Sequence, residues 1–182
     1  MKKKILYTLL TLLVAFVVFV IYTVNNPTSP LLTASFTENG KDITITYSSP
    51  FKKGRLIFGT ESESALVPFN KYWRTGENRH TMIKTSSDLT FGDNVLSKGE
   101  YSLYTKPGLN TWDITFNSTN AYFGISQPDS EMDLFTISVP SNITDVSIEQ
   151  LTFDFIPSPS DGPSSTALRL RWDLTEVVIP FN

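Results

Sequence analysis

Residues 101–117, YSLYTKPGLNTWDITFN, decide the fold of this chain. Apolar and polar residues alternate before and after the central KPGLN, and this is the period of a half-buried β-strand. Pro, Gly and Asn in KPGLN at 106–110 are typical of a reverse turn. The stretch therefore predicts a β-hairpin with a loop of about five residues. The residues expected on its apolar face are Trp112, Ile114 and Phe116.

The same alternation recurs on both sides of this hairpin, at 43–47, 135–139, 151–155 and 168–172. Turns rich in Gly, Pro and Ser separate these segments, and no stretch after residue 24 keeps a helical period. The pattern predicts an all-β domain. An antiparallel β-sandwich of jelly-roll type is favoured, with a β-barrel as the alternative. A short helix within 141–150 stays open.

The N-terminus is a candidate transmembrane helix. Lys2, Lys3 and Lys4 precede residues 5–24, which contain no charge, Gly or Pro. Twenty helical residues extend about 30 Å, which matches the apolar core of a bilayer. The run is longer than the roughly 7–15 apolar residues of a secretory signal, and no small-x-small cleavage site follows it. We expect an uncleaved signal anchor, with a cleaved and secreted form as the alternative.

The 182 residues then divide into an anchor at 1–24, a spacer at 25–33 and one β domain at 34–182. The three lysines predict a cytoplasmic N-terminus, which places the domain outside the cytoplasm, periplasmic or extracellular. Without these lysines, 12 Lys and Arg stand against 18 Asp and Glu, a formal net charge of −6. Such a balance disfavours nucleic acid as a partner. The absence of Cys excludes disulfides and thiolate chemistry.

Motifs of the common enzyme classes are absent, including G-x-S-x-G, H-E-x-x-H and the Walker loop. The chain has one histidine, His80, which we interpret as a strand residue with an ordinary hydrogen bond. We expect no cofactor and no metal. Two further patterns have alternative interpretations. Alternating carboxylates at 129–133 predict an acidic edge or a weak cation site, and Arg169 and Arg171 predict ion pairs with Asp154 or Glu176, or an anion site.

The segment 66–81, LVPFNKYWRTGENRHT, is the strongest candidate site. It combines basic, aromatic, amide and Gly residues in a way that no plain strand does. A structural motif would use Gly76 for a positive φ, and Thr75 and Asn78 to satisfy the loop backbone. A binding site would direct the same hydrogen-bond donors, together with Arg74, at a ligand. Both interpretations stay open.

Several stretches taken together resemble a known family: SP at 49–50, KGRLIFG at 53–59, the segment 66–81, GEYSLYTKPG at 99–108 and LRLRW at 168–172. From Ala34 onward the chain resembles the bacterial domain family of unknown function numbered 2911. The resemblance implies an exported bacterial domain without an established activity. Family members usually carry small or acidic residues where Arg79 and His80 stand, so His80 is a poor candidate for a shared catalytic residue.

We therefore predict a membrane-anchored β domain that binds a glycan or another component of the cell envelope, with the membrane as its other partner. Aromatic, guanidinium and amide groups together suit such a ligand. One alternative is an envelope enzyme that uses a carboxylate such as Glu77 or Glu100 beside Arg74. Another is a structural or assembly module without a ligand. The predicted ligand-binding residues are Arg55, Trp73, Arg74, Thr75, Asn78 and Tyr104.

Overall fold

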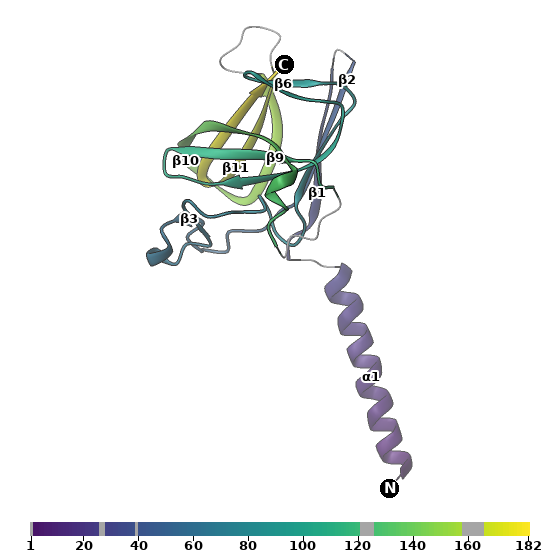
Figure 1. The fold of residues 1–182 in the computed structure, drawn as a ribbon. Coiled ribbons are helices and arrows are strands. Elements are labelled where there is room, and N and C mark those ends of the chain that lie inside the picture. Colours follow the sequence, from purple (N-terminus) through teal and green to yellow (C-terminus); the bar gives the residue numbers. More distant parts are fainter. Residues whose placement is uncertain (1, 26–27, 39, 121–125, 158–165) are drawn as a thin grey trace.

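The computed structural model describes residues 2–25, 28–38, 40–120, 126–157 and 166–182. One helix, α1 (Lys2–Asn25), precedes an antiparallel β domain (Figure 1). The part of α1 from Lys3 to Thr23 is long and apolar enough to cross a membrane, and none of it is buried against the domain. A signal sequence near an N-terminus has the same properties.

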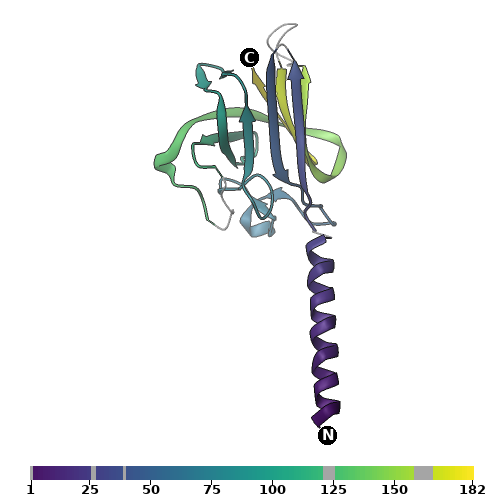
Figure 2. The same cartoon turned by 90° about the vertical axis from the view of Figure 1, so that its right-hand side faces the viewer.

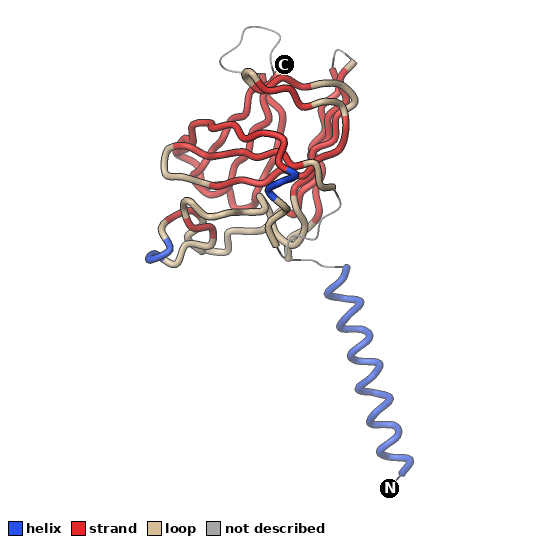
Figure 3. Tube along the Cα trace, in the orientation of Figure 1, coloured by secondary structure: helices blue, strands red, loops and turns tan. Residues whose placement is uncertain are grey.

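Seven strands form one sheet in the order β1-β2-β5-β8-β9-β10-β11, and every neighbouring pair is antiparallel. Two short strand pairs and two 3-10 turns complete the described part of the chain (Figure 3). The sheet strands are β1 (Leu31–Glu38), β2 (Lys41–Ser48), β5 (Thr81–Thr85), β8 (Gly99–Lys106), β9 (Thr111–Asn117), β10 (Asp133–Pro157) and β11 (Thr166–Phe181). The smaller elements are β3 (Phe58–Gly59), η1 (Glu61–Glu63), β4 (Val67–Pro68), β6 (Leu89–Phe91), β7 (Asn94–Leu96) and η2 (Ser130–Met132).

The long strand β10 curls the sheet. Its first half pairs with β9 and its second half with β11, and the register with β11 shifts twice between Ile143 and Thr152. The first and last strands of the sheet come together, since the ring centroids of Phe36 in β1 and Phe181 in β11 lie 6.4 Å apart. The predicted antiparallel all-β fold is confirmed. The main sheet of the domain is a single seven-stranded sheet, curled into a half-barrel (Figures 1 and 2).

The core lies inside this curl and follows the alternation in the sequence. The predicted hairpin is present as β8 and β9, and the side chains on its apolar face are all buried. In β11 the arginines face away from the core. Arg169 pairs with Asp154 at 2.6 Å and with Glu176 at 3.5 Å, and Arg171 pairs with Asp154 at 3.2 Å. The predicted ion pairs are therefore confirmed.

Two possibilities that the sequence left open are not realised. Residues 141–150 belong to β10 and form no helix. The carboxylates at 129–133 do not share the face of a strand, because η2 interrupts the segment and Asp129 caps it by accepting from the Glu131 N–H. Asp133 instead accepts hydrogen bonds from Tyr104 and Asn117. Among the described residues no group of three or more His, Asp or Glu is placed to hold a metal.

Candidate functional site

The loop between β4 and β5 is fastened at both ends by hydrogen bonds. The Trp73 N–H donates to the Thr105 carbonyl at 2.8 Å, and the Thr105 N–H donates back at 2.9 Å. The buried Thr75 hydroxyl donates to that of Thr105 at 3.1 Å, and the Thr81 hydroxyl donates to the Thr75 carbonyl at 2.7 Å. These bonds fasten the backbone of the loop to the sheet.

Gly76 is needed for close packing and not for its own φ. The positive φ angles in this loop belong to Thr75 (58°) and Asn78 (63°), so the prediction of a positive φ at Gly76 is wrong. A Cβ at Gly76 would lie 2.8 Å from the Ser48 carbonyl oxygen, a backbone atom of β2. Glycine therefore lets the loop lie directly against the sheet.

A cleft opens beside this loop, and we call it the arginine cleft. It consists of two adjoining cavities of about 290 and 260 Å³, which share Arg55 and Glu77. Residues from four separate parts of the chain form its walls. Those used in the argument below are Thr28, Ser29, Lys53, Arg55, Trp73, Arg74, Glu77, Asn78 and Trp172.

The two arginines of the cleft have no carboxylate partner among the residues that the structure describes. The half-buried Arg74 side chain makes no hydrogen bond or ion pair there. Within the described residues, the Arg55 side chain donates only to backbone carbonyls, those of Phe51 at 2.6 Å and Lys52 at 3.0 Å. Guanidinium groups that face a cleft without a counter-ion are suited to a carboxylate or phosphate ligand.

Glu77 is the one carboxylate among the described residues that line the cleft. It accepts a hydrogen bond from the Ser29 hydroxyl and is exposed to solvent. Glu100, the other carboxylate considered for an enzyme, lies opposite Lys84 in the sheet and does not line the cleft. The described part of the site thus offers one carboxylate beside its arginines.

The structure brings together four of the six predicted binding residues. Arg55, Trp73, Arg74 and Asn78 line the larger cavity of the arginine cleft. Thr75 is fully buried, and its hydroxyl lies within hydrogen-bond distance of the Trp73 carbonyl in the loop and of the Thr105 hydroxyl in β8. Tyr104 lies outside the cleft and donates to the Asp133 carboxylate at 2.7 Å. Burial and this hydrogen bond raise the pKa of Tyr104 to about 12, so the phenol stays protonated.

His80, in the same loop, is 1% exposed and does not line the cleft. Its Nε2 lies 3.2 Å from the Tyr72 hydroxyl and 3.3 Å from the Ser126 carbonyl. Burial lowers the pKa of His80 below its usual value, and the nearby Arg74 charge acts in the same direction. The imidazole is therefore neutral at pH 7, in keeping with a packed histidine with ordinary hydrogen bonds.

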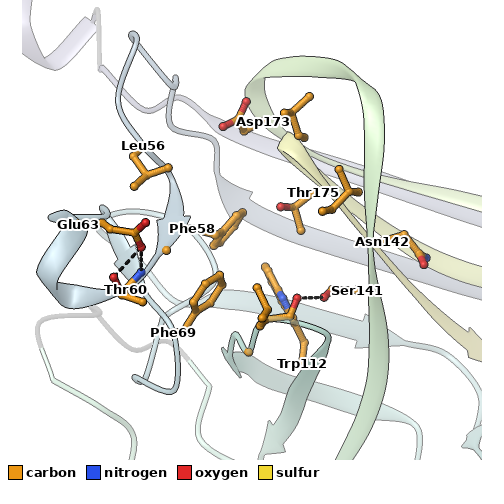
Figure 4. A pocket seen from close by; sticks show the side chains of 15 residues that line it. Leu56, Phe58, Thr60, Glu63, Phe69, Trp112, Ser141, Asn142, Asp173 and Thr175 are labelled. Atoms are coloured by element: carbon orange, nitrogen blue, oxygen red, sulfur yellow. Dashed lines mark hydrogen bonds between the residues drawn. The ribbon is translucent and has the colours of Figure 1, made fainter.

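A second hollow, of about 460 Å³, opens beside β3 (Figure 4). We call it the apolar hollow. Phe58, Phe69 and Trp112 line it, and the exposed Leu109 and Ile143 stand among its lining residues. Sequence analysis missed this hollow, because its walls come from β3, η1, β9, β10 and β11. The only local sequence feature was an apolar residue, Leu109, in a polar turn.

One group of aromatic rings separates the two hollows. The Phe58 ring lies 4.8 Å from Trp112, which lines the apolar hollow. It also lies 5.6 Å from Trp73 and 6.0 Å from Trp172, which line the arginine cleft. We call Phe58, Trp73, Trp112 and Trp172 the aromatic cluster. Both hollows are therefore supported by the same packed side chains.

The fold defines a β-rich domain, built on one curled antiparallel sheet, that follows a helix long and apolar enough to span a membrane. The family model described as a protein of unknown function (DUF2911) matches residues 29–181, and the chain belongs to this family. The predicted resemblance is confirmed. Neither the comparison with curated proteins nor that with solved structures found a match.

Proposed function

We propose that this protein is a membrane-tethered binding module that holds an anionic component of the cell envelope in the arginine cleft. α1 serves as the tether, and the β domain stands outside the cytoplasm. The observation that carries the proposal is the Arg74 side chain, which is half-buried, faces a cavity and has no partner among the described residues. Desolvating a cation without compensation is unfavourable, and a bound anion offsets that cost.

The chemistry of the cleft sets the class of ligand. Arg55 and Arg74 supply positive charge, and the exposed Asn78 amide can donate to and accept from hydroxyl groups. The chain after Lys4 is acidic overall, with a formal net charge of −6. A polyanion attracted by overall charge is therefore disfavoured. A small anionic group that carries hydroxyls fits best, as in an acidic glycan or a polar headgroup of the envelope.

The two rival functions have less support. General acid–base catalysis commonly uses two positioned groups, and Glu77 is alone among the described carboxylates of the cleft. A purely structural role accounts for Trp73, Thr75 and Gly76, which hold the loop backbone. A purely structural role does not explain the Arg74 and Asn78 side chains, which make no hydrogen bond among the described residues.

The test is Arg74→Gln in the full chain, screened against acidic and neutral glycans and against phosphate-bearing headgroups. We expect at least one anionic ligand to bind the wild type, and binding to fall by about 10-fold or more in the variant. The melting temperature should stay nearly unchanged. Arg79→Gln, an exposed arginine of the same loop outside the cleft, is the matched control and should bind normally. A collapse of stability in Arg74→Gln, with no ligand found, would support the structural role instead.

A further inference from the structure

The arginine cleft lies next to the end of the candidate membrane helix. Thr28 and Ser29 line its smaller cavity, and α1 ends at Asn25. Three residues of chain span at most about 11 Å. In Figure 1 the segment that carries β3 lies at the end of the domain that faces α1. The mouth of the cleft is therefore close to the point where the chain leaves the helix.

The chain that leaves the helix is fastened to the wall of the cleft. Ser29 is only 5% exposed, and its hydroxyl donates to the Glu77 carboxylate. The Pro30 carbonyl next to it accepts from the Ser49 N–H at 2.8 Å, and β1 begins at Leu31. Because these bonds fix residues 29 and 30 to the domain, the cleft cannot move far from the end of α1.

The thickness of a bilayer determines which part of the lipid lies level with the mouth of the cleft. The 21 residues from Lys3 to Thr23 extend about 32 Å, which covers a hydrocarbon core of about 30 Å. The headgroup layer adds roughly 5–8 Å on each side. From Thr23 to Thr28 the chain reaches at most about 14 Å, counting two helical and three extended steps. If α1 spans the membrane, the mouth of the cleft lies at or just above the lipid phosphates.

The groups that line the two cavities of the cleft match a phosphate that carries hydroxyls. Lys53, Arg55 and Arg74 are the cations of the cleft, and two guanidiniums can hold the oxygens of one phosphate. The Asn78 amide and the Glu77 carboxylate can bond to the hydroxyls of a glycerol headgroup. The phosphate-bearing molecules most concentrated at this depth are membrane lipids.

We infer that the arginine cleft binds the phosphate headgroup of an anionic lipid from the membrane that α1 enters. This inference rests on the proposed function and on the anchoring role of α1. The ligand is then a lipid of the same membrane that α1 enters. α1 and the cleft would both contact that membrane. Phosphatidylglycerol is the natural probe, because it joins one phosphate to a hydroxyl-bearing glycerol.

The test places the full chain in nanodiscs with equal amounts of phosphatidylglycerol and phosphatidylcholine. The lipids retained on the released protein are then counted by native mass spectrometry. We expect phosphatidylglycerol to be enriched over phosphatidylcholine, and the enrichment to fall by about 10-fold in the Arg55→Gln/Arg74→Gln variant. Arg79→Gln changes the charge equally in the same loop and should keep the enrichment. The Arg74→Gln single variant, with melting measured alongside, keeps the test valid if the double variant fails to fold.

Other outcomes overturn the inference in different ways. Equal retention of both lipids means that the cleft does not select a headgroup. An equal loss in Arg79→Gln means general attraction by charge. If glycerol phosphate in solution binds as tightly as the lipid, the ligand is a soluble phosphate compound and not a membrane lipid. If an acidic glycan binds in an Arg74-dependent way without lipid enrichment, the proposed function stands and this inference fails. If neither lipid nor glycan binds, both fail.

Discussion

The arginine cleft and the apolar hollow share one aromatic cluster but differ in whether their charged side chains are paired within the protein. In the apolar hollow, Glu63 accepts from Thr60 at 2.6 Å, and Asp173 pairs with Lys52 and accepts from Ser147 at 2.7 Å. Both carboxylates are therefore used within the protein. In the arginine cleft, the Arg74 guanidinium has no such partner among the described residues.

This difference separates scaffold from candidate site. A polar group bonded inside the protein contributes to the fold whether or not a ligand is present. A half-buried charge without a partner costs stability unless something else binds it. The apolar hollow is thus the weaker candidate for recognising a charged ligand, and its walls suit an apolar, uncharged molecule.

The largest expected effect tests whether both hollows depend on the aromatic cluster. Trp112→Ala removes a fully buried ring that touches Phe58. We expect the free energy of unfolding to fall by about 3–5 kcal/mol, since both apolar burial and packing are lost. Denaturant unfolding measures this loss. Leu109→Ala, at the exposed rim, is the control and should change stability by less than about 0.5 kcal/mol. Equal effects of the two substitutions would contradict a shared cluster.

The next effect should distort the arginine cleft and leave the apolar hollow unchanged. Gly76→Ala places a Cβ 2.8 Å from the Ser48 carbonyl oxygen, so the loop must move away from β2. We expect a loss of about 1–3 kcal/mol in the free energy of unfolding, together with weaker ligand binding in the cleft. Gly92→Ala is the control, because its position has open space and a positive φ. Gly92→Ala should lower stability without weakening ligand binding. A loss of binding in Gly92→Ala would contradict the steric explanation.

Most of the fold could be predicted from the sequence, because the alternation of apolar and polar residues along a strand is a local pattern. Pairs such as Ile114 and Phe116 are two residues apart, and their shared face follows from the pleat. The curl of the sheet was not readable. It depends on β10 continuing through 141–150, where short polar residues resemble a turn, and on register shifts that only its partner β11 defines.

The candidate site was predictable to a similar extent. The sequence singled out Trp73, Arg74 and Asn78, because such residues are unusual in a strand. It did not show that Thr75 and Tyr104 are used by the fold, since their partners Thr105 and Asp133 are about 30 residues away. The contribution of Ser29 was also missed, because it depends on the spacer packing against the domain.

A smaller effect compares a paired arginine with an unpaired one. Arg169→Gln removes the arginine that pairs with Glu176 and one of the two arginines that pair with Asp154. It should lower the free energy of unfolding by about 1–2 kcal/mol, given the partial exposure of these groups. Arg74→Gln should change it by less than about 0.5 kcal/mol. Chemical denaturation of both variants under one buffer gives the comparison. If Arg74→Gln is the more destabilising, Arg74 supports the fold and is not held ready for a ligand.

The smallest effect is a pH dependence of stability that comes from His80, in the loop beside the arginine cleft. The pKa of His80 is lowered in the folded protein, chiefly by burial, so the unfolded chain takes up a proton first as pH falls. The free energy of unfolding should therefore be fully retained above about pH 6.5 and decrease below it, by at most about 1.4 kcal/mol per pH unit. Because His80 is the only histidine, His80→Gln should remove this dependence between pH 7.5 and 5.5. Unfolding curves at the two pH values measure the difference. The same slope in both proteins would mean that carboxylates, and not the histidine of the cleft loop, set the response.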